Sequence, residues 1–351
     1  MRWPQSEVDR GRCAAGYGER SLHCVVRADR IGDRVPAQAH GRVHSVFERA
    51  CNIETRTGEL VTLLAQTLGN VPHGIRLAGP VAPFESWLMP GQNAILDSAT
   101  LCVPDARIAV DLSCAAVWRG AVAAVSMDLC ATDPRGAAIA VSLRELRATL
   151  YERAPEQGFA PLLAGSASAH SSFERAISTR LLHTLPLLAQ ATQRRDITAV
   201  AGAAARLLGL GPGLTPSGDD FITGYLAALW SRAGFESGID AMLPSLADAL
   251  APLFLRTNAI SRQMLSDAAQ GRFAEHMVDV TVAISCGGDV VAATARALAS
   301  GHSSGADTLC GLLFGYAPGQ AASLPPDRPQ RQMLPRAARF ERSAGRTAAI
   351  A

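Results

Sequence analysis

The sequence predicts an α+β fold, in which a smaller β-rich N-terminal domain is followed by a larger all-helical domain. Three observations support this prediction. The chain has 351 residues, more than the usual size of one domain. Short alternating apolar runs dominate from about 40 to 135, whereas apolar residues at helical spacing dominate from about 140 to 316.

The predicted β-rich domain, residues 40–135, consists of short apolar runs separated by turn residues. The runs are RVHSVFERACNI, GELVTLLA, GIRLA, NAILD, TLCV and RIAVDL. The turn residues are Gly58, Gly74, Pro90-Gly91 and Pro104-Asp105. This pattern predicts strands with hairpin-like connections.

The predicted helical domain, residues 140–316, has apolar residues at the spacing of amphipathic helices in nearly every segment. The expected helices span 142–153, 172–192, 195–208, 217–233, 240–256, 259–270, 273–285, 288–300 and 304–315. We expect the domain boundary in the CATDPRGAA segment at 130–138.

The two ends of the chain show little periodicity. Residues 1–38 are rich in arginine and glycine and predict a loose extension. Residues 322–351 are rich in proline and arginine and predict a mobile tail. We expect neither to pack in the core.

Composition excludes several functional classes. The formal net charge is +2, so a large basic field for nucleic acid is absent. All 33 basic residues are arginine, which excludes a Schiff-base or P-loop lysine. No apolar run reaches the roughly 18 residues of a membrane span, and the N-terminus lacks the apolar core of a signal peptide. We expect a cytoplasmic protein that binds neither nucleic acid nor membrane.

One segment concentrates backbone irregularity and negative charge, GLGPGLTPSGDDFITGYLAALW at 209–230. Asp219 and Asp220 fall in the first turn of the predicted helix, where acids complement the helix dipole. Ser217 and Asp220 also have the spacing of a capping box. Helix capping alone is therefore one interpretation of the two acids.

A second copy of this pattern occurs in GHSSGADTLCGLLFGY at 301–316. Ser304-Gly305-Ala306-Asp307 aligns with Ser217-Gly218-Asp219-Asp220, and each copy has a glycine four residues after its last aspartate, Gly224 and Gly311. Such a glycine costs about 1 kcal/mol relative to alanine, and capping does not require it. The glycines either clear space for a ligand or allow close helix packing. We favour one ligand pocket shared by the two helix starts.

A third polar group lies in LRTNAISRQMLSDAAQGRF at a predicted helix start. Its polar residues include Arg256, Thr257, Ser261 and Arg262. Because the chain has no lysine, a charged clamp for a substrate carboxylate must use arginine, which binds it through two parallel hydrogen bonds. Solvated or surface-paired arginines explain Arg256 and Arg262 equally well.

The predicted ligand is a small molecule with an anionic end. Free N–H groups at two helix starts favour phosphate or carboxylate oxygens, and the carboxylates would bind Mg²⁺ or accept amide N–H groups. The predicted catalytic residues, which are also the Mg²⁺ ligands if that metal binds, are Asp219, Asp220 and Asp307. The predicted substrate- and phosphate-binding residues are Gly211, Gly213, Thr215, Ser217, Gly218, Arg256, Thr257, Ser261, Ser304 and Gly305. The residues establish no cofactor with certainty, and Mg²⁺ is the one open candidate.

These motifs resemble the AllH family over about residues 40–316. The resemblance is carried by the two glycine-aspartate motifs, by TNAISRQMLSDAAQG, and by VHSVFERACNI, GELVTLL and IAVDLSCAAVW. It implies a subunit of an oxamate carbamoyltransferase, which converts oxalurate and phosphate to oxamate and carbamoyl phosphate in purine (allantoin) catabolism. It also implies two partner subunits that are required for activity.

Two other functions are compatible with the residues alone. One is a stand-alone Mg²⁺-dependent hydrolase of an amide- or nucleoside-type ligand, by analogy with helical hydrolases that gather aspartates from several helix ends. The other is a non-catalytic scaffold subunit, in which the glycines pack against a partner.

Overall fold

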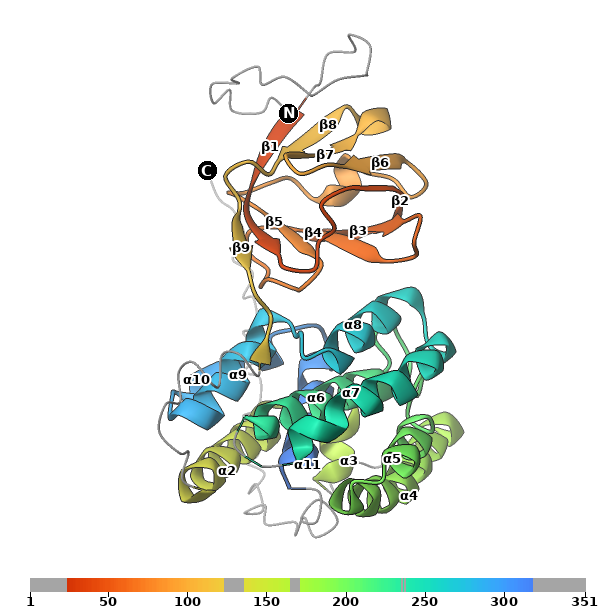
Figure 1. Ribbon diagram of the computed structural model, residues 1–351, viewed down its shortest axis with the longest axis vertical. Coiled ribbons are helices and arrows are strands. Elements are labelled where there is room, and N and C mark those ends of the chain that lie inside the picture. Colours follow the sequence, from red (N-terminus) through yellow and green to blue (C-terminus); the bar gives the residue numbers. More distant parts are fainter. Residues whose placement is uncertain (1–23, 123–135, 165–170, 235, 237, 318–351) are drawn as a thin grey trace, which may run out of the picture.

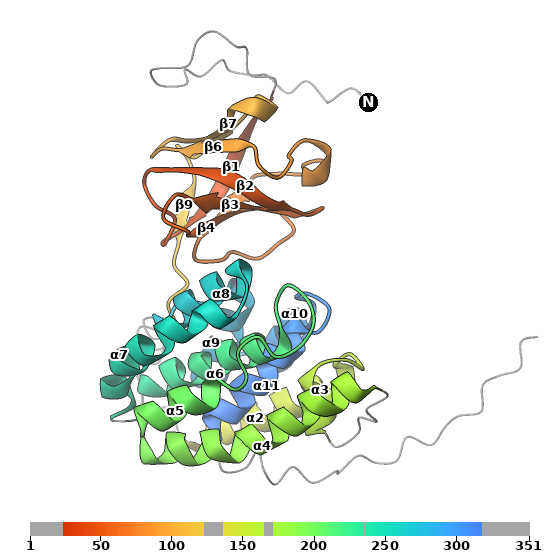
Figure 2. The same cartoon turned by 90° about the vertical axis from the view of Figure 1, so that its right-hand side faces the viewer.

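The structure is a computed structural model that describes residues 24–122, 136–164, 171–234, 236 and 238–317. A β domain and a helical domain follow one another along the long axis of the molecule (Figures 1 and 2). The predicted α+β class, with the β-rich domain first, is therefore confirmed. Of the expected boundary segment, 130–135 lie outside the described residues and 136–138 begin a helix, and the predicted tail lies wholly outside them.

The N-terminal domain is a small β-barrel. Its strands are β1 (Cys24–Gly32), β2 (Ala39–Val46), β3 (Ala50–Thr55), β4 (Leu60–Leu64), β5 (Gly74–Leu77), β6 (Asn93–Leu96), β7 (Thr100–Val103), β8 (Ile108–Asp111) and β9 (Ala116–Trp118). Their order is β5-β4-β3-β2-β6-β7-β8-β1-β9, and an additional β1–β5 pairing closes the barrel. Closure removes the exposed edges that an open sheet would present.

Strand β1 closes the barrel because it changes partner along its length. Residues Cys24–Arg27 pair in parallel with β8, and Ala28–Ile31 pair antiparallel with β5. The register shifts between Ala28 and Arg30, as at a β-bulge. The expectation of a loose extension at 1–38 is therefore wrong for residues 24–38. The arginines and glycines of this segment made the strand hard to recognise from the sequence pattern. Residues 1–23 lie outside the described part of the chain.

The helical domain contains helices in all the predicted places. They are α2 (Gly136–Arg153), α3 (Phe159–Leu163), α4 (Ser172–Arg194), α5 (Ile197–Ala204), α6 (Ser217–Ala233), α7 (Ile239–Leu250), α8 (Ala259–Ala269), α9 (Glu275–Cys286), α10 (Val290–Leu298) and α11 (Ser304–Tyr316). The expected helix 240–256 ends early, and a 3-10 helix, η3 (Ala251–Arg256), follows α7. Pro252 lacks an N–H group and cannot continue the α-helix. Within the described part of the chain, no helix has the length and apolarity to cross a membrane.

Helices α6 and α11 cross at the centre of the helical domain, and the other helices surround them (Figures 1 and 2). A Cβ atom on Gly224 would overlap the Thr308 carbonyl, and one on Gly311 would overlap the Phe221 carbonyl. Thr308 is the counterpart of Phe221 in the two aligned copies, so the contacts are reciprocal, as under a local two-fold axis. The glycines allow two backbones to touch. The interpretation that they clear space for a ligand, or pack against a partner subunit, is wrong.

Candidate functional site

The two repeated motifs form the N-termini of α6 and α11. Helix α6 begins at Ser217 after Pro216, and α11 begins at Ser304 after Ser303. In neither helix does the N-cap side chain accept a hydrogen bond from a backbone N–H group of the first turn. The capping-box interpretation of Ser217 and Asp220 is therefore wrong, because Ser217 already lies inside the helix.

Each helix start faces the other. The Ser304 hydroxyl of α11 lies near the Asp220 carboxyl of α6, and the Ser217 hydroxyl of α6 lies near the Asp307 carboxyl of α11. Asp307 also acts electrostatically on Asp220. Both carboxyls have no solvent exposure. The reciprocal crossing of α6 and α11 thus places two carboxyl groups, each with a serine of the opposite helix, in one buried region.

Asp220 has fewer hydrogen-bond partners than Asp307. Neither carboxyl oxygen has a well-aligned hydrogen-bond partner among the described residues, although the hydroxyls of Ser304 and Thr215 face it. Burial raises the pKa of Asp220 well above its usual range, the two hydroxyls oppose this, and the nearby Asp307 carboxyl raises it further. Asp220 therefore favours its protonated form in the fold.

Asp307 has a backbone partner that Asp220 lacks. Its Oδ1 accepts the Phe159 N–H at 2.6 Å, at the first residue of α3. Gly158 precedes this residue with a φ of 89°, and a Cβ there would lie 2.5 Å from the same oxygen. Burial raises the pKa of Asp307 to about 6, while the Phe159 N–H and the Ser217 and Ser303 hydroxyls act against it. The sequence pattern missed Gly158 and Phe159, because five-residue α3 is too short to show helical periodicity.

Asp219 points elsewhere and has both oxygens engaged. Its Oδ1 accepts the Gly209 N–H at 2.7 Å, and its Oδ2 accepts the Thr257 hydroxyl at 2.5 Å. The Ser261 hydroxyl also faces Asp219, and burial raises the pKa of this carboxyl. Asp219, Thr257 and Ser261 therefore join the loop before α6 to the start of α8. The prediction required Asp219, Asp220 and Asp307 to face one ligand. Asp219 instead directs its two oxygens at Gly209 and Thr257.

Two of the backbone N–H groups at the predicted binding residues are already used. The Gly218 N–H donates to the Leu210 carbonyl at 2.8 Å, and the Gly305 N–H donates to the Ser300 carbonyl at 3.0 Å. Gly211 and Gly213 lie in the preceding loop with φ of 121° and 97°, which suits glycine. The Gly218 and Gly305 N–H groups are therefore not free to hold an anion, because each donates to a carbonyl of the segment before its helix.

The arginines do not clamp this region either. The Arg256 side chain is exposed at the end of η3. Arg262 lines a cleft between the two domains. Adjacent helix positions such as Asp219 and Asp220 point in different directions, and across the described residues no three His, Cys, Asp or Glu side chains converge to hold a metal. The structure thus gives no support to Mg²⁺ bound by Asp219, Asp220 and Asp307.

A closed β-barrel before a helical domain, with two facing Ser-Gly-x-Asp helix starts, defines a class of two-domain α+β proteins with a buried pair of acids. Two family models match this chain. The AllH family N-terminal domain matches residues 23–117, and the oxamate carbamoyltransferase subunit AllH matches residues 207–316. Together they cover more than half of the sequence, so the chain belongs to the AllH family. No solved structure matches the chain.

Proposed function

We propose that this chain is a subunit of an oxamate carbamoyltransferase that contributes substrate or phosphate binding. The reaction converts oxalurate and phosphate to oxamate and carbamoyl phosphate in purine (allantoin) catabolism. A cytoplasmic location and two further subunits are part of the proposal. The observation that carries it is the family match over 207–316, which contains both facing helix starts.

The chemistry of this reaction needs a proton donor. A phosphate oxygen forms a bond to the carbamoyl carbon, the bond from that carbon to the amide nitrogen breaks, and the departing nitrogen takes a proton. A carboxyl that remains protonated near neutral pH is suited to store such a proton. The burial of Asp220 and its pKa, which is raised well above the usual range, support this role in the proposal, whereas Asp307, with a pKa of about 6, is mostly ionised at pH 7. Asp219 is assigned a positioning role, because both its oxygens hold neighbouring elements.

The activity is tested by co-expressing the full chain with candidate partner subunits and purifying the complex. We expect carbamoyl phosphate to form when oxalurate and phosphate are supplied together, and not when either is omitted. A purified complex of all subunits that forms no carbamoyl phosphate would overturn the proposed function.

The role of Asp220 is tested with Asp220→Asn in the same complex. The amide keeps the size of the side chain but holds no exchangeable carboxyl proton, so we expect turnover to fall by about 10²-fold or more, the range of general acid–base catalysis. The matched control is Asp248→Asn on α7, an exposed position. Equal activities in the two variants, with unchanged melting temperatures, would remove Asp220 from the proposed chemistry.

A further inference from the structure

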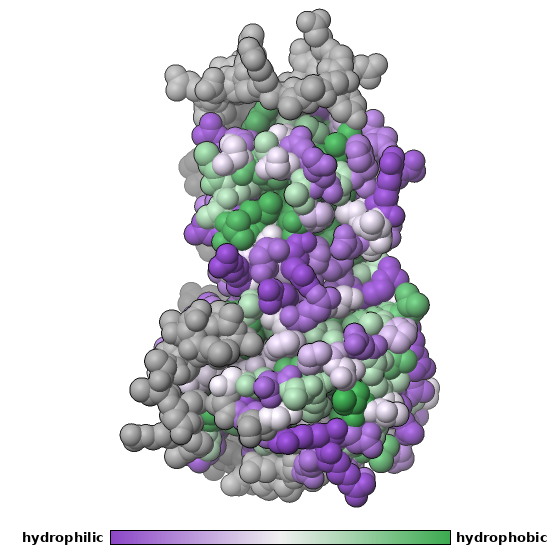
Figure 3. All heavy atoms as spheres, in the orientation of Figure 1, coloured by the Kyte–Doolittle hydropathy of each residue, from purple (hydrophilic) through white to green (hydrophobic). Residues whose placement is uncertain are grey.

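A polar cleft of about 550 Å³ lies between the β-barrel and α8. Its volume falls in the range of small-molecule sites, which often lie between domains. Figure 3 shows hydrophilic residues gathered along the junction of the two domains on the face drawn. The cleft is separate from the buried acid pair, because neither Asp220 nor Asp307 lines it.

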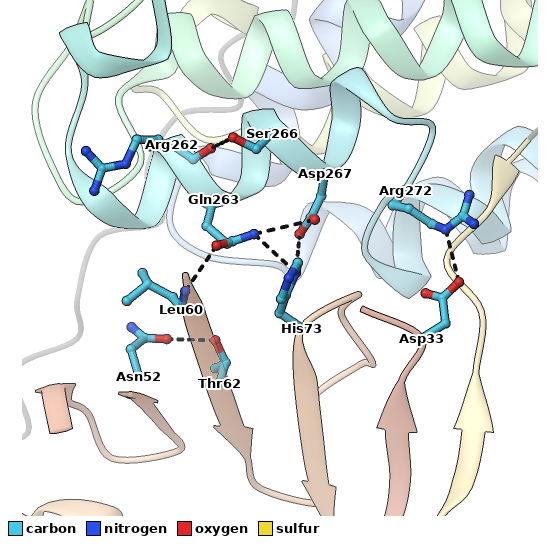
Figure 4. A network of polar contacts seen from close by, with 10 residues as sticks. All are labelled: Asp33, Asn52, Leu60, Thr62, His73, Arg262, Gln263, Ser266, Asp267 and Arg272. Carbon is cyan, nitrogen blue, oxygen red and sulfur yellow. Dashed lines mark hydrogen bonds and ion pairs between the residues drawn. The ribbon is translucent and has the colours of Figure 1, made fainter. Parts of the chain in front are cut away.

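A hydrogen-bonded group spans one side of the cleft and holds the domains in register. His73 Nδ1 lies 3.1 Å from Asp267 Oδ2, and Gln263 Nε2 lies 3.1 Å from the same ring nitrogen. Gln263 Oε1 accepts the Leu60 N–H at 3.0 Å (Figure 4). His73 and Leu60 come from the barrel, and Gln263 and Asp267 come from α8. The walls of the cleft are therefore fixed before a ligand arrives, which reduces the ordering that binding requires.

The acidic residues of the lining are already engaged. Asp33 Oδ2 accepts from Arg272 Nε at 3.0 Å, a second contact between the domains that is visible in Figure 4. Asp267 is paired with His73. Glu59 accepts the Thr57 hydroxyl at 3.1 Å and is exposed at the rim. The carboxylates of Asp33 and Asp267 thus each have a partner on the other domain, although the Oδ1 atom of Asp33 is buried without one among the described residues.

Two arginines in the lining have no such engagement. Arg34 follows β1 on the barrel wall, and Arg262 lies on α8 on the facing wall. Both are partly buried, and neither guanidinium has a hydrogen bond or an ion pair among the described residues. Guanidinium groups bind carboxylate and phosphate oxygens through paired N–H donors. The structure thus brings two arginines, one from each domain, to the lining of one cleft.

We propose that the interdomain cleft binds a small oxyanion through Arg34 and Arg262. The ligand class is a molecule with a carboxylate or phosphate group, small enough for the cleft. Gln270 also lines the cleft, and its side-chain carbonyl would accept an amide N–H of the same ligand. The site itself does not depend on the proposed carbamoyltransferase activity. Only the choice of oxamate as a probe rests on that proposed function.

The test is calorimetric titration of the purified full chain with oxamate and, separately, with inorganic phosphate. We expect at least one of them to bind, with the dissociation constant raised about tenfold or more in Arg34→Gln and in Arg262→Gln, because each loses a charge-assisted pair of hydrogen bonds. The matched control is Arg180→Gln, an exposed arginine of α4, which should leave binding unchanged. The probe that binds identifies the carboxylate or the phosphate as the source of the oxyanion.

The outcomes separate this proposal from the proposed function. If neither anion binds, or if both cleft variants bind as well as the native chain, the cleft proposal is overturned whatever the activity of the complex. If arginine-dependent binding is found, the cleft proposal is supported even when the complete complex forms no carbamoyl phosphate. Both variants change partly exposed side chains without partners, so their melting temperatures should match that of the native chain.

Discussion

The N-termini of α6 and α11 share a sequence pattern but differ in what surrounds their acids. Asp307 accepts a backbone N–H from Phe159, a residue 148 positions away in the chain. Asp220 occupies the equivalent place on α6 and has no well-aligned partner among the described residues. The pKa of Asp307 is raised to about 6, and that of Asp220 is raised well above its usual range. Equivalent residues of a repeat thus differ in their hydrogen-bond partners, while burial raises the pKa of both carboxyls.

The comparison also shows where the repeat is symmetric. The glycine contacts between α6 and α11 are reciprocal, so the crossing of the two helices is symmetric, whereas the loops that cover the acids are not. The close packing of the two backbones leaves no room for a larger side chain at the crossing. The loops can differ in sequence and conformation without disturbing it. Asp220 and Asp307 interact electrostatically, so the two carboxyls titrate as a coupled pair.

The largest expected effect is at the crossing. Gly224→Ala and Gly311→Ala each place a Cβ against the backbone of the other helix. Such overpacking costs about 1–3 kcal/mol where side chains can move and more against backbone, so we expect each to lower the free energy of unfolding by about 3 kcal/mol or more. Urea denaturation measures this. The control is Gly202→Ala in α5, where the new Cβ meets no atom within 4 Å, so it should stabilise by up to about 1 kcal/mol. A loss of stability in only one of the Gly224→Ala and Gly311→Ala variants would contradict a symmetric crossing.

The next effect is the pH dependence that Asp307 introduces. Its pKa is raised from 3.8 to about 6 in the fold, so the folded state binds this proton more tightly than the unfolded state does. The resulting stability is present below pH 4 and is lost as pH rises through 6. Asp307→Asn removes this loss, and the variant should gain about 2–3 kcal/mol relative to the native chain between pH 4 and pH 7, at 1.36 kcal/mol per pKa unit.

The matched variant for this experiment is Asp111→Asn, because the pKa of Asp111 is lowered by the Ser113 hydroxyl and N–H. A lowered pKa contributes stability above the unfolded value and loses it as pH falls. Asp111→Asn should therefore lose stability relative to the native chain as pH rises, opposite in sign to Asp307→Asn. Denaturation curves at several pH values would show both. Equal slopes for Asp307→Asn and the native chain would contradict the raised pKa.

A smaller effect should follow from Thr257→Val, which tests the tie made by Asp219. The variant leaves one buried carboxyl oxygen without its 2.5 Å hydrogen bond, and we expect a loss of about 1–3 kcal/mol. Thr198→Val, at an exposed position of α5, is the control. If thermal and urea unfolding of the two variants coincide, the Thr257 hydroxyl does not tie the start of α8 to Asp219.

The smallest expected effect concerns Asn258, which connects the start of α8 to the loop before α6. Asn258 caps α8 by accepting the Ile260 and Ser261 N–H groups, and it donates to the Leu214 carbonyl of the loop at 2.8 Å. Asn258→Ala loses both and should cost about 1 kcal/mol. Asn258→Asp keeps the cap and loses only the donor, so its cost should be smaller. Equal costs, measured by urea denaturation, would mean that the cap contributes nothing.

The positions of the secondary-structure elements were largely predictable from local patterns. Helices such as α6 and α11 have apolar residues that repeat at helical spacing over several turns. Most barrel strands are short apolar or alternating runs that are bounded by turn residues. The failures are equally local in origin. Strand β1 was missed because charged residues occupy its exposed positions, and α3 was missed because it is a single short turn.

The sequence by itself determined the two-domain order, the repeat, and the membership of the AllH family, because each depends on residue types at short spacings along one chain. Only the tertiary structure decided what the repeat does. Whether Gly224 and Gly311 make room for a ligand or for a helix depends on which backbone lies opposite. Whether Asp219, Asp220 and Asp307 converge depends on donors brought from Gly209, Thr257 and Phe159. The cleft between Arg34 and Arg262 likewise exists only after the barrel packs on α8, because no local pattern encodes the distance between residues on separate domains.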